Sequence, residues 1–248
     1  MIQNYNESAV IVHVDFCEAW KCNYSSEVQS CHFGQSLPQL SLHTGMYYTK
    51  EENTGFCTIS ESKQQDASAI WIHMEPVLRD IRLKFPEVDT IELWSDGPSK
   101  QYRYKKDFSI LCNVPPTLGF QRTTWNFFAN SHGKGAPGCT GGTVKRTADS
   151  LVLQGSDIVD GKIFHEMVGR SLCSTQFYHI AEGDMQTYDT LLSQPLKPVP
   201  ATKNIHQVIP YGNSIHCRSL SCFCSEPQMC QCFSPTTFQL TENTHARV

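Results

Sequence analysis

Residues 90–102 read TIELWSDGPSKQY, and this stretch decides the fold. Its first half is an apolar run of strand-forming residues that stops at Asp96-Gly97-Pro98, and Gly-Pro is a strong turn signal. The carboxylate of Asp96 is therefore predicted at the end of a strand, at the edge of a sheet, where ligands gather in open α/β proteins. The alternative is that Asp96 only initiates the turn.

A second acid stands in the same setting. Residues 9–16 read AVIVHVDF, a buried-strand pattern that runs into Asp15. Two carboxylates at strand ends in an α/β chain indicate a site for a divalent metal, since a hard cation such as Mg²⁺ prefers oxygen ligands.

The composition limits the class of protein. A chain of 248 residues with 40% apolar residues can form one large domain, or one domain with an appendage. Its net charge of −4 means that any nucleic-acid site must be local. We expect no membrane span and no secretory signal, because the sequence has neither a long apolar run nor a basic N-terminal region followed by one. Twelve cysteines without such a signal indicate a reducing compartment, nuclear or cytoplasmic.

The rest of the chain gives an order of elements. Strands are predicted within 30–49 (one or two), at 56–59, at 123–128 and at 204–209, and helices at 66–85, 99–111, 143–153 and 162–173, with a weaker helix before residue 188. In the first helix Asp66 is a plausible N-cap, and Pro76 is expected to bend or split the helix. A glycine-rich loop is predicted at 130–142.

Three strands, a helix, a strand, a helix, a strand and a helix follow one another in the pattern of an RNase H-like fold. We therefore expect an α/β mixed sheet, an antiparallel three-strand meander plus parallel strands, flanked by helices. The predicted organisation is a core at 9–192, a linker at 193–203 and a cysteine-rich tail at 204–235.

Several short blocks, in order along the chain, resemble one known family. They are Asp15-Phe-Cys-Glu18, Trp94-Ser-Asp96-Gly97, Gln101-Tyr102, Phe127-Phe-Ala129, SHGKG at 131–135, GGTVKR at 141–146 and SCFC at 221–224. These blocks resemble the catalytic core of transposase-derived proteins of animal genomes, which are similar to the DDE transposases and retroviral integrases. The resemblance covers roughly residues 10–235.

The resemblance implies phosphodiester chemistry with two Mg²⁺ or Mn²⁺ ions held by three carboxylates. Asp15 and Asp96 match the first two acids. The third is expected in the glycine-rich block, where Gly138 stands instead, and residues 130–146 contain no acid at all. Asp149 is too far along the next helix to replace it, whereas Glu18 is a nearer substitute. We therefore expect impaired catalysis.

Basic residues gather near both motifs. Lys100, Arg103, Lys105 and Lys106, with Tyr102 and Tyr104 between them, could contact DNA phosphates beside Asp96, or could form a solvated helix face. His132, Lys134, Lys145 and Arg146 would add to the same nucleic-acid surface, and the backbone N–H groups of the glycine loop could receive a phosphate.

The tail carries two Cys-x-Cys pairs, Cys222 and Cys224, then Cys230 and Cys232. Four cysteines can hold Zn²⁺ in a tetrahedral site. The alternative is that they are reduced packing cysteines.

Three functions remain open from the sequence. The chain is a catalytically impaired core that binds DNA or protein, an active two-metal nuclease or strand transferase with a substitute ligand, or a remnant without activity. Because the chain begins only eight residues before its first predicted strand, we expect DNA recognition to come from a partner, a homo-oligomer or a region outside this sequence.

Overall fold

The computed structural model describes residues 8–26, 36–97, 101–129, 135–224 and 229–241. Within these ranges one nine-stranded sheet runs through the molecule in the order β6-β3-β2-β1-β4-β5-β7-β8-β9. The strands are β1 (Ala9–Lys21), β2 (Gln39–Tyr48), β3 (Asn53–Ser60), β4 (Thr90–Ser95), β5 (Arg122–Phe127), β6 (Thr175–His179), β7 (Gln207–Tyr211), β8 (Ser214–Arg218) and β9 (Thr236–Gln239).

The directions of the five central strands confirm the RNase H-like mixed sheet. β1, β2 and β3 form an antiparallel meander. β4 then returns beside β1 and runs parallel to it, and β5 runs parallel to β4. The connections from β3 to β4 and from β4 to β5 each contain a helix, as parallel neighbours require.

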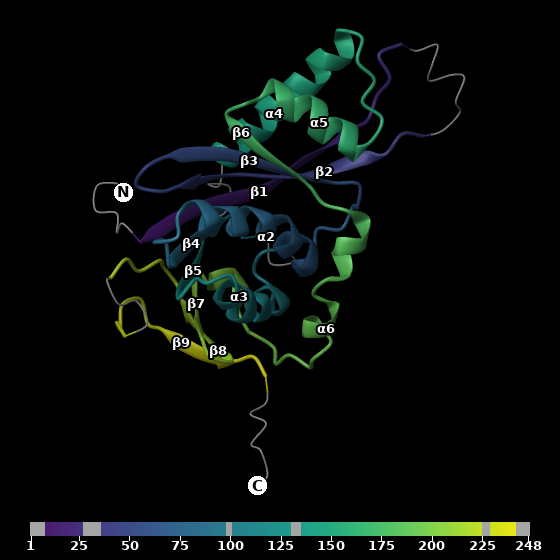
Figure 1. Cartoon of the computed structure of the whole chain (residues 1–248). Helices are drawn as coiled ribbons and strands as arrows, with labels where there is room; N and C mark the ends of the chain where they lie inside the picture. Colours follow the sequence, from purple (N-terminus) through teal and green to yellow (C-terminus); the bar gives the residue numbers. More distant parts are fainter. Residues whose placement is uncertain (1–7, 27–35, 98–100, 130–134, 225–228, 242–248) are drawn as a thin grey trace.

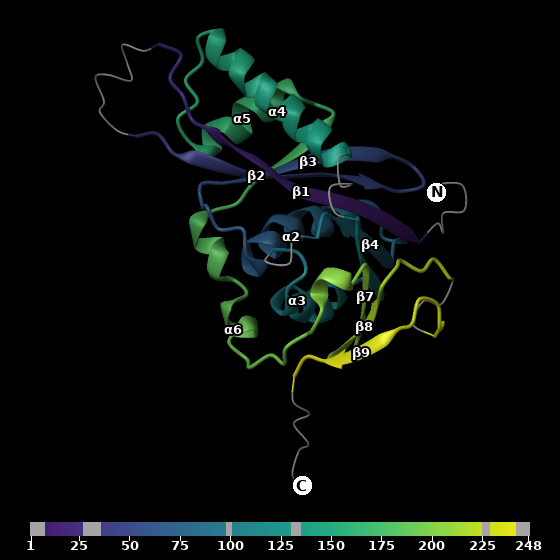
Figure 2. The ribbon, with the colours of Figure 1, turned by 180° about the vertical axis from the view of Figure 1, so that it is seen from behind.

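Helices cover both faces of this sheet (Figures 1 and 2). α2 (Ala67–Lys84) and α3 (Lys105–Thr117) lie on one face, and α4 (Ala136–Leu153) and α5 (Gly161–Ser171) lie on the other. Each pair buries its own apolar cluster, with Val12, Trp71 and Trp125 in the first and Trp20, Leu42 and Phe164 in the second. A sheet with two covered faces explains why the central strands read as continuous apolar runs.

The first long helix follows the sequence closely at its start. The Asp66 side chain accepts a hydrogen bond from the Ala69 N–H at 3.1 Å, so the predicted N-cap is confirmed. Pro76 was expected to bend or split the helix, and it does not split it, since α2 runs without a break from Ala67 to Lys84. The burial of one whole face of α2 outweighs the backbone hydrogen bond that proline removes.

Two other helix predictions were displaced. α3 begins at Lys105 rather than near residue 99, and the weaker helix predicted before residue 188 is limited to one short 3-10 helix. Residues 175–179 instead form β6, parallel to β3 at the edge of the sheet, followed by the short 3-10 helix η1 (Glu182–Gln186). Thr, Phe and Tyr in this segment favour a strand once an edge is available for pairing.

The glycine-rich segment was predicted as a loop through residue 142, yet α4 already begins at Ala136. Pro137 occupies the first turn, where its missing N–H costs nothing. Gly141 is buried in the helix, and a Cβ atom added to it would lie 3.0 Å from the Cβ atom of Cys17. Close packing of α4 on the sheet therefore outweighs the low helix propensity of glycine.

The cysteine-rich segment extends the sheet. β7 pairs antiparallel with the end of β5, β8 pairs with β7, and β9 forms the edge. Between the last elements of the core and β7 lie the short helix α6 (Asp189–Leu192) and the 3-10 helix η2 (Thr202–Asn204).

None of the helices in the described ranges is long and apolar enough to span a membrane. The eleven cysteines in these ranges are all free thiols.

The packing of α4 generates a matched test with two glycines of one helix. Gly141→Val would push side-chain atoms into Cys17 and should lower the free energy of unfolding by roughly 1–3 kcal/mol. A Cβ atom at Gly138 would meet nothing within 4 Å, so Gly138→Ala should raise the free energy by up to about 1 kcal/mol. Urea denaturation of both variants measures the difference, and equal effects would contradict the packing of α4 on β1.

Candidate functional site

Asp15 and Asp96 lie side by side because of the register between two parallel strands. The last aligned pair of β1 and β4 is Val14 with Ser95. The next position on each strand is an aspartate, and neighbouring strands are about 4.8 Å apart. The sequence predicted Asp15 at the end of a strand. The structure differs, because β1 continues to Lys21 and Asp15 lies inside it. The parallel ladder ends at the two acids.

Both carboxylates belong to the sheet face that α4 covers in part. Val10, Val12 and Val14 of β1 are buried in the core beneath α2 and α3. Ser95 of β4 is also fully buried. Since successive side chains alternate between the faces of a strand, Asp15 and Asp96 project from the opposite face.

The acids influence each other electrostatically. Burial of the Asp15 carboxyl, together with the negative charge of Asp96, raises the pKa of Asp15 to about 6, although a hydrogen bond with the Phe16 backbone acts in the other direction. The Oδ1 atom of Asp96 is buried and has no hydrogen-bond partner among the described residues. Two crowded carboxylates with a free buried oxygen form an arrangement that a cation would stabilise.

The first turn of α4 lies beside this pair. Thr44, which is aligned with Asp15 on the neighbouring strand β2, donates a hydrogen bond from its Oγ1 atom to the Pro137 carbonyl at 3.0 Å. A Cβ atom on Gly135 would lie 3.2 Å from Cε1 of His13, and Gly141 meets Cys17. The start of α4 therefore runs along β1 from His13 to Cys17, past Asp15.

Gly138 lies between these two contacts, in the first turn of α4, on a level with Asp15. It is exposed, and the space around its Cα atom is open. A larger side chain at this position would therefore meet no neighbour within 4 Å of its Cβ atom.

A third ligand is not found in the described part of the chain. There, the four tail cysteines form the one cluster of three or more His, Cys, Asp or Glu ligand atoms close enough to share an ion. Glu18 lies at a β-bulge of β1 between Cys17 and Trp20, its side chain is 89% exposed, and it pairs with Lys145 at 3.3 Å. Asp149 accepts a hydrogen bond from the Trp20 indole at 2.8 Å. Neither residue completes the acid pair in this arrangement.

Arg103 was predicted to contact phosphates, and the structure corrects this prediction. Its side chain is 1% exposed, donates hydrogen bonds to the carbonyls of Lys203 (2.7 Å) and Phe128 (3.0 Å), and packs over the Phe127 ring. A Cβ atom at Gly97 would lie 1.8 Å from its Nε atom. Arg103 therefore fastens the ends of β4 and β5 to the segment that leads into β7.

The charge of Arg103 also reaches the acid pair. Burial lowers the pKa of Arg103, whereas the carboxylate of Asp96 acts to raise it. A buried guanidinium with two carbonyl partners keeps the end of β4 in place and supplies positive charge beside Asp96.

The other predicted basic residues do not gather on one surface in the described ranges. Lys105 donates a hydrogen bond to the Leu196 carbonyl at 2.9 Å, and Lys106 lines a pocket of about 210 Å³ between the starts of α2 and α3 and the helix α6. Lys145 and Arg146 lie on α4, on the other face of the sheet. Lys100, His132 and Lys134 lie outside the described residues.

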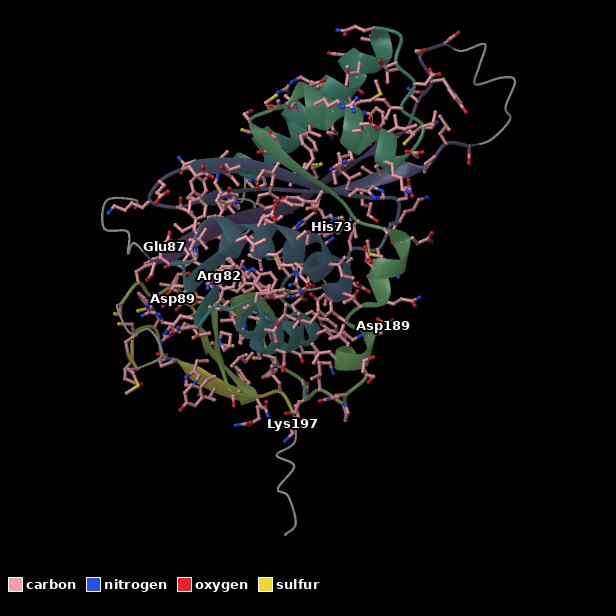
Figure 3. The ribbon with its side chains drawn as sticks, in the orientation of Figure 1. His73, Arg82, Glu87, Asp89, Asp189 and Lys197 are labelled. Atoms are coloured by element: carbon pink, nitrogen blue, oxygen red, sulfur yellow. The ribbon has the colours of Figure 1, made fainter. Side chains whose placement is uncertain are left out.

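Tyr102 is buried rather than available to nucleic acid. Its hydroxyl lies 3.0 Å from Nε2 of His43, and the ring packs near Phe16. His73, which projects from α2 toward the sheet (Figure 3), forms a hydrogen bond with Thr58 at 2.7 Å. Burial lowers the pKa of His73 to about 3, so this polar layer behind the acid pair is uncharged at neutral pH.

The four tail cysteines converge in space. The Sγ atoms of Cys222, Cys224, Cys230 and Cys232 all lie within 4.8 Å of one another. The Cys222 and Cys230 sulfurs are 3.2 Å apart, and the Cys224 and Cys232 sulfurs are 3.9 Å apart. A tetrahedral ion with bonds of about 2.3 Å to sulfur sets its ligands about 3.8 Å apart. The cluster therefore has the dimensions of a metal site.

Buried polar side chains hold this cluster against the sheet. Arg218 donates hydrogen bonds to the carbonyls of Cys230 (3.0 Å) and Cys232 (3.1 Å) and to the Cys230 sulfur at 3.4 Å. Gln207 bonds both the N–H and the carbonyl of Cys222. Hydrogen bonding from Cys222 lowers the pKa of Cys230 to about 7, whereas contacts with neighbouring thiols raise the pKa of Cys224 to about 12. Full ionisation of the set requires a cation.

Sequence reasoning missed the parts that support these two clusters. Gln207 and Arg218 are isolated polar residues in the sequence, and Arg103 stands in a basic cluster that suggested a phosphate contact; only their burial shows that they hold the site. The glycine in Asp96-Gly97 is the one visible signal, because the missing side chain leaves room for Arg103.

Comparisons with known proteins give a family but no activity. The chain belongs to the family described as "Domain of unknown function (DUF8701)", which matches residues 1–221. A search of curated proteins finds no match. Among solved structures, two of the human cytomegalovirus terminase nuclease domain are similar at 9% identity. The one soaked with Mn and bound to an inhibitor has a TM-score of 0.30 over 77% of this chain and 79% of that chain. The other has a TM-score of 0.29 over 77% and 72%.

The raised pKa of Asp15 predicts a stability change that depends on pH. Below about pH 3 the carboxyl is protonated in both the folded and the unfolded chain, so Asp15→Asn should leave the free energy of unfolding nearly unchanged there. Above pH 6 the folded protein holds a charge that the fold disfavours, since the pKa rises from 3.8 to about 6 on folding. Asp15→Asn should then stabilise the protein by about 1–2 kcal/mol, after allowance for solvent screening.

Denaturation of both proteins between pH 3 and pH 8 measures this effect. Glu87→Gln is the control, because Glu87 is exposed in the turn after α2 (Figure 3). A stability difference for Asp15→Asn that does not vary with pH would contradict the described environment of Asp15.

Proposed function

We propose that this member of the DUF8701 family is an RNase H-like core of transposase and integrase type that binds DNA and has lost most of its cleavage activity. The observation that carries the proposal is the acid pair, since the register of β1 and β4 brings Asp15 and Asp96 together. The position that the resemblance assigns to the third acid is Gly138, in the first turn of α4.

The residues present fit a divalent cation at the pair. Asp15 and Asp96 would hold it, because Mg²⁺ and Mn²⁺ prefer carboxylate oxygens and Asp96 has a buried oxygen without a partner. When bound, such an ion activates an attacking oxygen or stabilises a leaving oxygen at phosphorus. Two carboxylates give a weaker site than three, and this shortage is the physical reason for the proposed loss of cleavage.

The residues of the chain would then hold the site together and bind DNA without cleaving it. Arg103 holds the β4 and β5 ends, and Thr44 holds the start of α4 through the Pro137 carbonyl. Lys145 and Arg146 lie on α4, on the same sheet face as the acids, and are proposed to contact DNA phosphates. The proposed location of the protein is the nucleus or the cytoplasm, and DNA recognition would come from a partner or a second copy of the chain.

We further propose that the four-cysteine cluster binds Zn²⁺ and is structural. Four sulfur ligands leave no open coordination position for a substrate. Arg218 supplies a buried positive charge beside the thiolates, which offsets the negative charge of a zinc ion with four such ligands.

Restoration of the third acid tests the proposal. Nicking of a labelled DNA duplex in Mg²⁺ or Mn²⁺ is expected from Gly138→Asp, little from the natural chain, and none from Gly138→Asp combined with Asp96→Ala. Gly183→Asp is the matched control, since it adds an acid at another glycine with open space around it.

Each alternative has its own outcome in this assay. Cutting by the natural chain that Asp96→Ala abolishes would mean that another ligand, such as Glu18, completes the site. If Gly138→Asp does not nick DNA but still binds it, the protein is a DNA-binding module and the proposed third-acid position is wrong. If Gly138→Asp neither nicks nor binds DNA, the result would support the third alternative, a remnant without activity.

The zinc site makes a second, independent prediction. The purified chain should carry about one zinc ion, and Cys230→Ser should lose it and become less stable. Cys173→Ser, which removes an exposed thiol outside the cluster, should keep both metal and stability. Elemental analysis and thermal unfolding measure these changes. A natural chain that stays free of zinc when refolded with it would contradict the proposed site.

A further inference from the structure

A row of aromatic rings crosses the sheet beside the acid pair. The ring of His13 on β1 lies 4.9 Å from that of Phe128, which follows β5. Phe128 lies 5.0 Å from Trp94 on β4, and Trp94 lies 6.1 Å from Phe223 of the cysteine-rich segment. The planes of the last two rings are nearly parallel, with 7° between them. They form a stacked pair.

This row lies on the same sheet face as the two acids. Trp94 precedes Asp96 by two positions on one strand, and His13 precedes Asp15 by two positions on another, so each ring shares a face with an acid. α4 packs on β1, β2 and β3 and leaves the β4 and β5 part of this face without a helix among the described elements. The aromatic row covers this part of the sheet face in place of a helix.

Phe223 ends the row with an open face. Its side chain is 60% exposed although it is stacked on Trp94. It stands between two ligands of the cysteine cluster, Cys222 and Cys224. The backbone of Cys222 is fixed to the sheet by Gln207, which in turn bonds Asn126 of β5 at 3.0 Å. The open ring is therefore held in place by a rigid support.

We propose that Phe223 and Trp94 form a stacking platform for an unpaired base of a nucleic-acid strand that passes the acid pair. The proposal deepens the proposed function, on which it rests for the identity of the partner as nucleic acid. A flat, exposed π-surface suits a base, because every base offers a flat face of its own and stacking tolerates any sequence. An aliphatic protein partner would gain little from two parallel rings.

The position of the platform names the substrate class. A base stacked beside Trp94 belongs to a nucleic-acid strand whose backbone can reach Asp96, the residue that directly follows β4. In paired DNA the bases are already stacked on one another and unavailable. We infer that the preferred ligand is single-stranded nucleic acid, or a duplex with an unpaired end.

The test measures binding of a fluorescently labelled oligothymidine by anisotropy, without Mg²⁺ and without chelator, so that the zinc site stays intact. Phe223→Ala should weaken binding about tenfold, and Phe223→Tyr should retain it. Phe233→Ala is the matched control, because this ring is also exposed, at 44%, in the same segment but outside the stack. The fluorescence of Trp94 should be quenched by the oligonucleotide, and Trp94→Phe should remove that quenching.

Three results would overturn the inference. They are equal binding by Phe223→Ala and the natural chain, an equal loss for single-stranded and fully paired DNA, and a change of oligomeric state in Phe223→Ala without a change in oligonucleotide binding. The last result would identify the platform as a contact between copies of the chain. Because no divalent ion is added, absence of nicking by Gly138→Asp would leave this measurement unaffected, so failure of the two proposals can be told apart.

Discussion

The parallel register between β1 and β4 is the constraint on which the site depends. Aligning Val14 with Ser95 sets Asp15 next to Asp96 at the end of the ladder. A shift by one residue would turn one acid into the core beneath α2 and α3, where the valines of β1 now lie. The apolar pattern of the two strands therefore forces two negative charges together. Burial of the Asp15 carboxyl and, after it, the negative charge of Asp96 raise the pKa of Asp15.

The second constraint is the close approach of α4 to the same strands. Gly135 and Gly141 carry no side chain where His13 and Cys17 come near, and Thr44 ties the first turn through the Pro137 carbonyl. These contacts hold the first turn of α4 against β1 and β2. The proposed position of the third carboxylate lies in this turn, where Gly138 stands. A fold can retain such a position without its chemistry, because the packing contributes stability and the acid would not.

Much of this arrangement can be predicted from the sequence, because it depends on residues that are close together along the chain. The strand pattern before Asp15 and Asp96, the stripe of α2 and the Asp66 cap are signals that depend on near neighbours along the chain. The start of α4 was misplaced because its glycines look like a loop until the strand they pack against is known. Arg103 was read as a surface cation because nothing nearby in the sequence shows that Phe128 and Lys203 would bury it. The pairing of Phe223 with Trp94 joins residues more than a hundred positions apart, beyond any local pattern.

The central claim is that Asp15, Asp96 and position 138 surround one metal site that lacks its third ligand. The most direct measurement is calorimetric titration of zinc-loaded protein with Mn²⁺, comparing the natural chain, Asp15→Asn and Gly138→Asp. The claim predicts weak binding by the natural chain, none by Asp15→Asn and binding at least tenfold tighter by Gly138→Asp. If Gly138→Asp binds Mn²⁺ no better than the natural chain, position 138 does not face the acid pair, and the claim is wrong.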